Sequence, residues 1–180
     1  SPLFYAPNVS WLVQRNGMNP RHSLMISLNA SEGNHMHANG ISMELYGKGY
    51  VLAPDAGIGL YLYSGLDYLE YYSQFPSHNT VCVDGISSYP VMKSNHSFDL
   101  LSCFPASSAA AAAKDKFPSV TYSDVYFREP ESRADQTRMM SIVTTGPETG
   151  YYVDIFRSRK ERGGDKMHDY FYHNLDAGPQ

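Results

Sequence analysis

Short strand-like runs recur along this chain, and residues typical of turns separate them. Residues 41–46 alternate apolar and polar side chains, which is the pattern of a strand with one buried face. Residues 50–53 form another run, and Gly47 and Gly49 before it indicate a tight turn. The other runs expected to be strands are residues 23–28, 80–83, 120–127, 137–144, 151–157 and 169–173. Strands at this spacing are typical of a sandwich or barrel.

Composition also favours strands over helices. The chain has 15 tyrosines and an aromatic fraction of 13%, and aromatic residues are enriched in strands. Residues 80–83 lead into Asp84-Gly85, a dipeptide typical of β-hairpin turns. One segment differs, because the alanines of 107–116 predict a short surface helical turn or a flexible loop. We therefore expect residues 1–180 to form one all-β domain, an antiparallel β-sandwich with little helix.

Charge and cysteine content exclude several classes of protein. The formal net charge of -4 gives no basic footprint, so nucleic acid is not an expected partner. No run of 18 consecutive apolar residues is present, and we expect no membrane span. The N-terminal residues do not resemble a signal peptide. Two cysteines, Cys82 and Cys103, are too few for a disulfide scaffold. Two buried thiols are expected, with one disulfide as the alternative.

Three histidines and an aspartate fall within 44 residues of strand-like sequence. Alternate strand positions face the same way, so His35 and His37 can project side by side. Asp55 lies in a Pro-Asp-Ala-Gly turn, and His78 precedes an apolar run. Imidazole and carboxylate groups from several strands suit a divalent transition metal. The alternative is a hydrogen-bonded polar cluster at a sheet edge, in which Asp55 serves only its turn.

The order of these motifs resembles the β-domain of the heparinase II/III family of polysaccharide lyases, which includes the oligoalginate lyases. The motifs that carry the resemblance are His35-Met36-His37, Leu45-Tyr46-Gly47, Leu52-Ala53-Pro54-Asp55-Ala56-Gly57 and His78-Asn79-Thr80-Val81-Cys82-Val83-Asp84-Gly85. Residues 152–157 and 168–171 also look like strands of that domain. The resemblance covers most of the chain from about Leu24 onward, and the ordered series is more specific than any single motif. It implies a β-sandwich of the supersandwich type.

The resemblance also assigns roles to single residues. His37, Asp55 and His78 match the family's zinc ligands, and the zinc is expected to be mainly structural. His35 matches a histidine at the active-site cleft. Tyr72 matches a tyrosine in the loop before the His-Asn-Thr motif, although other tyrosines lie close to it in the sequence. Asn79 is expected to brace its turn or to orient an imidazole of the zinc site.

The same resemblance implies a partner domain. Family members place an α-helical toroid before the sandwich, and the usual catalytic tyrosine and an asparagine that neutralises the substrate carboxylate lie in it. No helical repeat precedes Leu24 in this chain. We therefore expect the chain to be the C-terminal part of a longer lyase, inactive alone and periplasmic or secreted.

The expected reaction is a β-elimination on an acidic polysaccharide. A lyase removes the proton alpha to a uronate carboxylate and expels the O4 leaving group. Positive or hydrogen-bonding groups stabilise the charge that develops on the carboxylate, and a tyrosine or histidine moves the protons. His35 and Tyr72 are residues of the right type for proton transfer.

Two other classes remain open from the sequence. A non-catalytic carbohydrate-binding sandwich would use tyrosine-rich strands to stack on sugar rings around a structural metal. A cupin-like metal enzyme also uses a His-x-His motif on a β-barrel. In this chain Glu44 follows His37 by seven residues, and His78 comes late for the cupin pattern.

Overall fold

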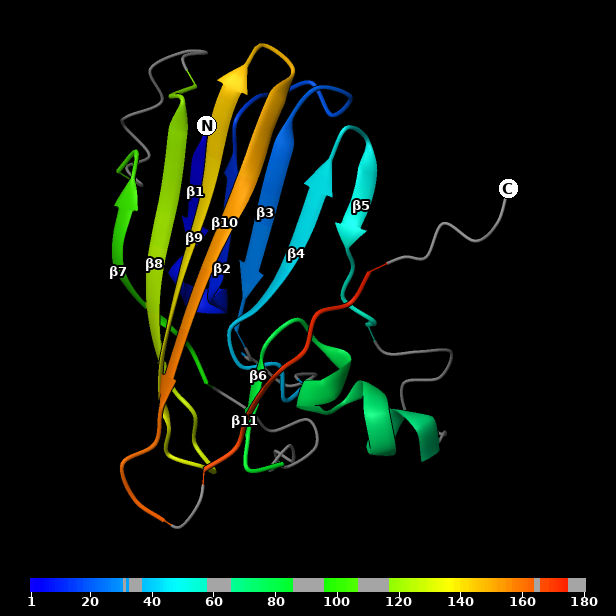
Figure 1. Ribbon diagram of the computed structural model, residues 1–180, viewed down its shortest axis with the longest axis vertical. Helices are drawn as coiled ribbons and strands as arrows, with labels where there is room; N and C mark the ends of the chain where they lie inside the picture. Colours follow the sequence, from blue (N-terminus) through cyan, green and yellow to red (C-terminus); the bar gives the residue numbers. More distant parts are fainter. Residues whose placement is uncertain are drawn as a thin grey trace.

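The strands of the computed structural model form two larger antiparallel sheets and one small sheet. The structure describes residues 1–30, 32, 37–57, 66–85, 96–106, 117–163 and 166–174. Figure 1 shows the two larger sheets lying face to face, with the small sheet at one end of the molecule. The expected all-β antiparallel sandwich is confirmed.

The first sheet is a meander of five strands in chain order, β1 (Leu3–Ala6), β2 (Trp11–Arg15), β3 (Leu24–Asn29), β4 (Ser42–Gly47) and β5 (Tyr50–Ala53). The second sheet has the order β10 (Thr149–Arg159), β9 (Asp135–Gly146), β8 (Val120–Arg128) and β7 (Asp99–Phe104). The small sheet pairs β6 (Val81–Val83) with β11 (His168–Tyr170). Short helical turns are η1 (Pro7–Val9), η2 (Tyr68–Tyr72) and η3 (Phe75–Ser77).

The core lies between the two larger sheets. Leu24, Ile26 and Leu28 are alternate residues of β3, and all three are buried in the main apolar cluster. Phe127 and Met140 come from the second sheet and belong to the same cluster. Each buried side chain of this size contributes roughly 1.5–3 kcal/mol of transfer free energy. A slip of one residue would turn the apolar set of β3 outward, so burial fixes the strand register.

Most predicted strands are present at or near their expected positions. Residues 50–53 coincide with β5, and its turn from β4 has the expected backbone. Lys48 and Gly49 have φ angles of 57° and 85°, which is the left-handed conformation of a tight hairpin turn. We did not predict β1, β2 and β7. β2 buries Gln14, whose side-chain amide donates to the Met140 carbonyl at 3.1 Å, so the strand lacks a simple apolar alternation.

The residues that would form the second strand of the hairpin expected at Asp84-Gly85 lie outside the described residues, and the described part of the chain shows a long-range pairing of β6. Both residues have positive φ, as the turn signal requires, but the described partner of β6 is β11. Asp84 fixes that pairing, since its N–H donates to the Met167 carbonyl at 2.8 Å and its Oδ1 accepts from the Met167 N–H at 2.9 Å. The expected helical turn in 107–116 lies outside the described residues.

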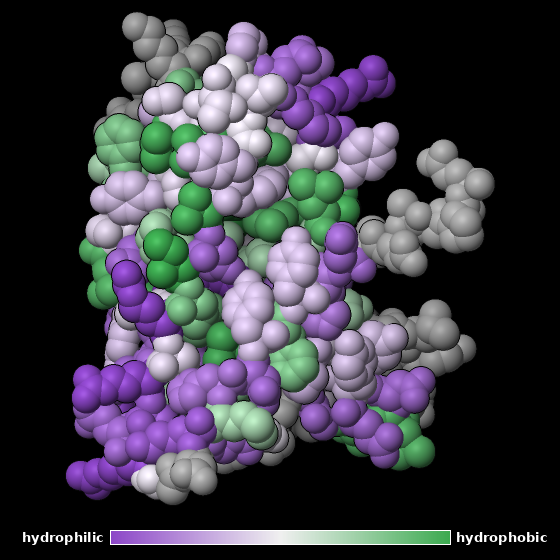
Figure 2. All heavy atoms as spheres, viewed as in Figure 1, coloured by the Kyte–Doolittle hydropathy of each residue, from purple (hydrophilic) through white to green (hydrophobic). Residues whose placement is uncertain are grey.

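Both cysteines are thiols rather than a disulfide; Cys82 is buried, as expected, whereas Cys103 is only partly buried. Within the described ranges, no helix is long and apolar enough to cross a membrane. Figure 2 shows hydrophilic side chains gathered at the end of the sandwich where the loops after β8 and β10 meet. Both signs of charge line a cleft of about 510 Å³ there, including Glu131, Arg133, Lys160, Glu161 and Arg162.

Candidate functional site

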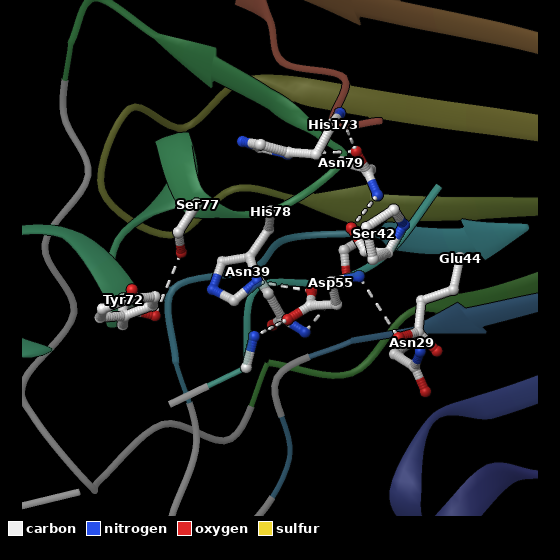
Figure 3. A network of polar contacts seen from close by, with 12 residues as sticks. Asn29, Asn39, Ser42, Glu44, Asp55, Tyr72, Ser77, His78, Asn79 and His173 are labelled. Atoms are coloured by element: carbon white, nitrogen blue, oxygen red, sulfur yellow. Dashed lines mark hydrogen bonds and ion pairs between the residues drawn. The ribbon is translucent and has the colours of Figure 1, made fainter. Parts of the chain in front are cut away.

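Asp55 closes a turn, and the turn positions its carboxylate for a hydrogen bond with His78. It lies in the turn after β5, where its Oδ1 accepts the Gly57 N–H at 2.8 Å and closes a local Asx turn. Its own N–H points to Glu44 Oε1 at 3.4 Å. These contacts hold the carboxylate so that Oδ2 lies 2.6 Å from Nδ1 of His78 (Figure 3). The turn role is present, and the same carboxylate contacts His78; the metal-ligand role of Asp55 stays a prediction.

His78 is held in the segment between η3 and β6, and its side chain is almost wholly buried. Nδ1 is engaged by Asp55, whereas Nε2 has no hydrogen-bond partner among the residues that the structure describes. Buried polar atoms are usually satisfied, so an unpaired ring nitrogen indicates a position where a ligand can bind.

His37 completes the predicted set. Its ring centroid lies 5.5 Å from that of His78. The rings of His37 and Tyr68 also meet edge-on, with their centroids 5.6 Å apart. His37, Asp55 and His78 line one cleft of about 530 Å³. The further described residues that line this cleft are Val9, Trp11, Asn29, Ala30, Glu32, Asn39, Ser42, Glu44 and Gly57. The structure therefore brings the three residues together from separate segments.

Burial and neighbouring groups shift the pKa values of His37 and Asp55 in the cleft. Burial lowers the pKa of His37, and the neighbouring His78 lowers it further against the opposing effect of Asp55. Burial alone would raise the pKa of Asp55, but the hydrogen bond and charge of His78, with the Gly57 N–H and His37, give a net lowering. The balance favours an uncharged imidazole at His37 and an ionised carboxylate at Asp55.

His37, Asp55 and His78 are residues of the types that bind zinc, but the contact between Asp55 and His78 has the geometry of a hydrogen bond. Two histidines and a carboxylate are ordinary zinc ligands. The separation of 2.6 Å between His78 Nδ1 and Asp55 Oδ2 is a hydrogen-bond distance, whereas two ligands of one tetrahedral zinc lie about 3.3 Å apart. Among the described residues, no three His, Cys, Asp or Glu side chains are placed to hold a metal ion as they stand. Zinc binding by both groups would need this hydrogen bond to open.

Asn79 holds the loop that carries His78. Its Nδ2 donates to the Met43 carbonyl and to the Pro54 carbonyl, both at 3.0 Å, and its side chain is buried. Pro54 directly precedes Asp55, so this amide ties the two halves of the hydrogen-bonded pair to β4. Asn79 thus braces the turn, which is one of the two roles expected for it.

Arg138 is the large polar residue that the sequence analysis missed. It lies on β9, is fully buried, and uses all five N–H donors of its guanidinium. Nε and Nη2 reach the two carboxylate oxygens of Asp154 at 3.0 and 2.7 Å. Nη1 donates to the carbonyls of Ile41 and Asn79 at 2.7 and 2.6 Å, and Nη2 donates to the Tyr170 hydroxyl at 2.9 Å.

A sequence signal for this network existed. Arg138 and Asp154 each interrupt a strand-like run with a charge, and opposite charges inside neighbouring strands indicate an ion pair. Burial also raises the pKa of Tyr170, which keeps its hydroxyl protonated and able to donate to Asp154 Oδ2 at 2.6 Å.

Of the two predicted proton-transfer residues, the structure describes only Tyr72. His35 lies outside the described residues. Tyr72 ends η2 and is half-buried; its carbonyl accepts the Ser77 hydroxyl at 3.1 Å, and its ring meets that of Tyr71 edge-on at 5.3 Å. Tyr72 is not among the described residues that line the cleft. Catalytic roles for both stay predictions.

Comparison with known proteins identifies the family. The family model described as "Heparinase II/III-like, C-terminal" matches residues 1–153. An endo-acting ulvan lyase from Formosa agariphila is 32% identical over 149 residues, which cover 78% of this chain and 18% of that protein.

Solved structures share the fold. The heparan sulfate lyase HepC from Pedobacter heparinus has a TM-score of 0.66 at 16% identity, over 92% of this chain and 23% of that chain. A heparinase III also has a TM-score of 0.66, at 15% identity, over 91% and 23% of the two chains. This chain thus spans less than a quarter of the length of each of these relatives. With a family model matched over most of its length, the chain belongs to the family described as heparinase II/III-like, C-terminal.

Proposed function

We propose that this domain is part of a lyase that cleaves a uronate-containing acidic polysaccharide by β-elimination. The observation that carries the proposal is the cleft in which His37, Asp55 and His78 meet, in a chain whose relatives are polysaccharide lyases. Ulvan and heparan sulfate, named for two of those relatives, set the substrate class to test first.

The cleft offers the kinds of group that a sugar polymer needs. Trp11 is 41% exposed, and its ring is fixed by the Nε1–H bond to Ser27 Oγ at 2.9 Å. An indole face at the cleft can stack on a pyranose ring, while Asn39 and Ser42 supply hydrogen-bonding groups. His35 precedes His37 by two residues, and we propose His35 and Tyr72 as proton-transfer residues of the elimination.

We also propose that His37, Asp55 and His78 hold a zinc ion. His78 Nε2, which has no partner in the described part of the chain, and the nearby His37 ring support it, and the Asp55–His78 hydrogen bond would give way to the metal. Zinc, when bound, ties the three segments together and adds positive charge beside the cleft. Elemental analysis of protein purified without chelator measures this proposal directly.

We propose that the isolated chain does not turn over substrate. The chain spans less than a quarter of its relatives, and the cleft here is one surface of a larger site. The resemblance supports an N-terminal helical domain as the other wall. Losing the positioning of substrate between two walls removes roughly 7–11 kcal/mol of barrier lowering.

The test is an assay of the parent protein and of this chain against ulvan, heparan sulfate, heparin and alginate. Elimination leaves an unsaturated uronate, whose ultraviolet absorbance reports turnover. We expect the parent protein to form this product from at least one polymer and the chain alone to form none. Binding without cleavage by the parent protein, or hydrolysis without the unsaturated product, would overturn the lyase assignment.

A further inference from the structure

A second cavity lies on the outer face of the first sheet, at the end away from the small sheet. Its walls are the loop between β2 and β3 and the turn between β4 and β5, which Figure 1 shows at the same end of the sheet. Its volume is about 250 Å³, and its floor includes Arg15, Met25 and Tyr46. Among the described residues that line it, Arg15 is the only charged one, and most of the others are apolar or glycine.

The sheet register places this cavity and the histidine cleft on one face. Arg15 of β2 and Tyr46 of β4 line the cavity, and both pair with Met25 of β3. Trp11 of β2 and Ser42 of β4 line the cleft, each four residues before the cavity residue of its own strand. Residues four apart on a strand point to the same side of the sheet, roughly 13 Å from each other. One extended ligand on this face can therefore reach both cavities.

The cleft by itself is poorly suited to the charge of an acidic polymer. Its described lining includes the carboxylates of Glu32, Glu44 and Asp55 but no lysine or arginine. These carboxylates repel the negative groups of a uronate or sulfated sugar. The second cavity has the opposite character, because its one described charge is the Arg15 guanidinium. A polyanion that lies along this face is therefore held best with a negative group beside Arg15.

Arg15 is available to bind such a group. Its side chain is half-buried, and its Nε is buried without a hydrogen-bond partner in the described part of the chain. Glu44 does not supply that partner, because its Oε2 accepts the Tyr46 hydroxyl at 2.8 Å and its Oε1 lies 3.4 Å from the Asp55 N–H. A buried charged group without an acceptor is costly, so this nitrogen indicates a position for an external one. A guanidinium binds carboxylates and similar oxyanions through two parallel N–H bonds.

The walls of the cavity suit the ring of a sugar. Tyr50 is the first residue of β5 and is 72% exposed, although it is a large aromatic residue. The left-handed turn at Lys48 and Gly49 directly precedes it and fixes where its ring begins. An exposed phenol ring can lie on the apolar face of a pyranose while its hydroxyl stays in water. Met18, on the loop between β2 and β3, adds an exposed apolar side chain to the wall.

We propose that this cavity is a subsite for an acidic sugar unit, in which Arg15 binds the carboxylate or sulfate and Tyr50 packs on the ring. The proposal rests on the proposed function for the identity of the polymer and adds a second contact with it outside the cleft. Because the two rows of residues are roughly 13 Å apart, only several linked sugars can occupy the cleft and the subsite together. Arg15 is then a binding residue that favours longer chains, and it takes no part in proton transfer.

The first test compares long and short substrates of the parent protein. The substrate is the polymer that the parent protein cleaves among ulvan, heparan sulfate, heparin and alginate, together with its shortest cleaved oligosaccharide. We expect Arg15→Gln to raise KM for the polymer about tenfold or more with little change in kcat, since the contact is equal in the ground and transition states. KM for the shortest oligosaccharide should not change. Arg15→Lys should recover only part of the loss, because an ammonium lacks the planar fork.

The matched control is Arg157→Gln, which removes the same charge from an exposed position on β10 of the other sheet. We expect it to keep the wild-type KM for the polymer. A wild-type KM in Arg15→Gln, an equal rise for the shortest oligosaccharide, or an equal rise in Arg157→Gln would overturn the subsite.

A second measurement does not depend on activity. Heparan sulfate oligosaccharides added to this chain should shift the Arg15 Nε–H signal in nitrogen-15 NMR. Loss of the shift with the desulfated form assigns the contact to a sulfate, and loss with the carboxyl-reduced form assigns it to a carboxylate. If the parent protein cleaves heparan sulfate and the Arg15 signal does not move, the subsite is wrong and the lyase proposal stands. If the parent protein cleaves no uronate polymer, the lyase proposal fails, and the Arg15 signal still decides whether the cavity binds an acidic glycan.

Discussion

Two hydrogen-bonded pairs, Asp55–His78 and Arg138–Asp154, contact the segment of His78 and Asn79, and they differ in how completely their polar atoms are satisfied. The Arg138–Asp154 pair is closed, since every N–H donor of the guanidinium has an acceptor. The Asp55–His78 pair is open, since His78 lines the cleft and its Nε2 has no partner among the described residues. A closed network specifies structure, whereas an open one leaves a group for a ligand.

The closed pair also supports the open one. Arg138 Nη1 holds the carbonyls of Ile41 and Asn79, which lie on the chain next to the cleft residues Ser42 and His78. Hydrogen bonds from Arg138 thus hold this part of the chain on the side of the core, whereas His78 Nε2 has no described partner on the side of the cleft. This difference predicts that substitutions in the two pairs change different properties of the protein.

The largest expected effect on stability is that of Arg138→Met. It leaves Asp154 and two carbonyls without their buried partner, so we expect the free energy of unfolding to fall by about 3–5 kcal/mol. Urea denaturation of the chain measures this. Arg128→Met is the matched control, because Arg128 pairs with Asp135 at 3.3 Å with its side chain largely in solvent, and we expect a loss below about 1 kcal/mol. Equal losses in the two variants would remove the distinction between closed and exposed pairs.

A smaller loss is expected for Asn79→Ala. Two carbonyls lose their donor and the His173 segment loses its anchor, so stability should fall by about 2 kcal/mol. Hydrogen exchange should show the Phe171 and His173 amides losing protection first. Unchanged protection there would show that Asn79 does not hold this segment.

The residues of the two pairs differ in how well they can be predicted from the sequence. Asp55 lies in a turn motif and His78 precedes an apolar run, so the sequence motifs and the family resemblance single out both residues, together with His37 of the His-x-His motif. The closed pair depends on strand register, because Arg138 meets Ile41 and Asn79 only after β9 has packed against the first sheet. β3 and β4 bury apolar residues at alternate positions, whereas β2 buries the polar Gln14 and was not predicted. The Asp84-Gly85 turn was visible, but its pairing with Met167 was not.

In the open pair, we expect Asp55→Asn to lower stability by about 1–2 kcal/mol, because the amide oxygen can still accept the Gly57 N–H but the hydrogen bond between His78 and a carboxylate is lost. Its larger consequence should be a fall of roughly 10–100-fold in affinity for zinc. Thermal unfolding with and without zinc separates the two effects. A large loss of stability in the absence of metal would make Asp55 a structural residue like Arg138.

The smallest expected effect is a change in pH dependence at Asp84. Its hydrogen bond with Lys160, at 2.6 Å, and the Met167 N–H lower the pKa of the carboxyl in the folded state. The stabilisation is therefore present above the unfolded pKa of about 3.9 and is lost as the pH falls through the lower folded pKa. Asp84→Asn should flatten stability between neutral pH and about pH 3, measured by urea unfolding. An unchanged pH profile in Asp84→Asn would contradict this.

The most direct test of the difference between the open and the closed pair is a zinc titration of the purified, chelator-treated chain by calorimetry. We expect about one zinc per chain for the wild type, a loss of that binding in His37→Ala and His78→Ala, and full binding in His22→Ala, whose histidine contacts Glu148 elsewhere on the surface. Absence of zinc binding by the wild type, or unchanged binding in His78→Ala, would contradict the claim that the Asp55–His78 pair is an open ligand site.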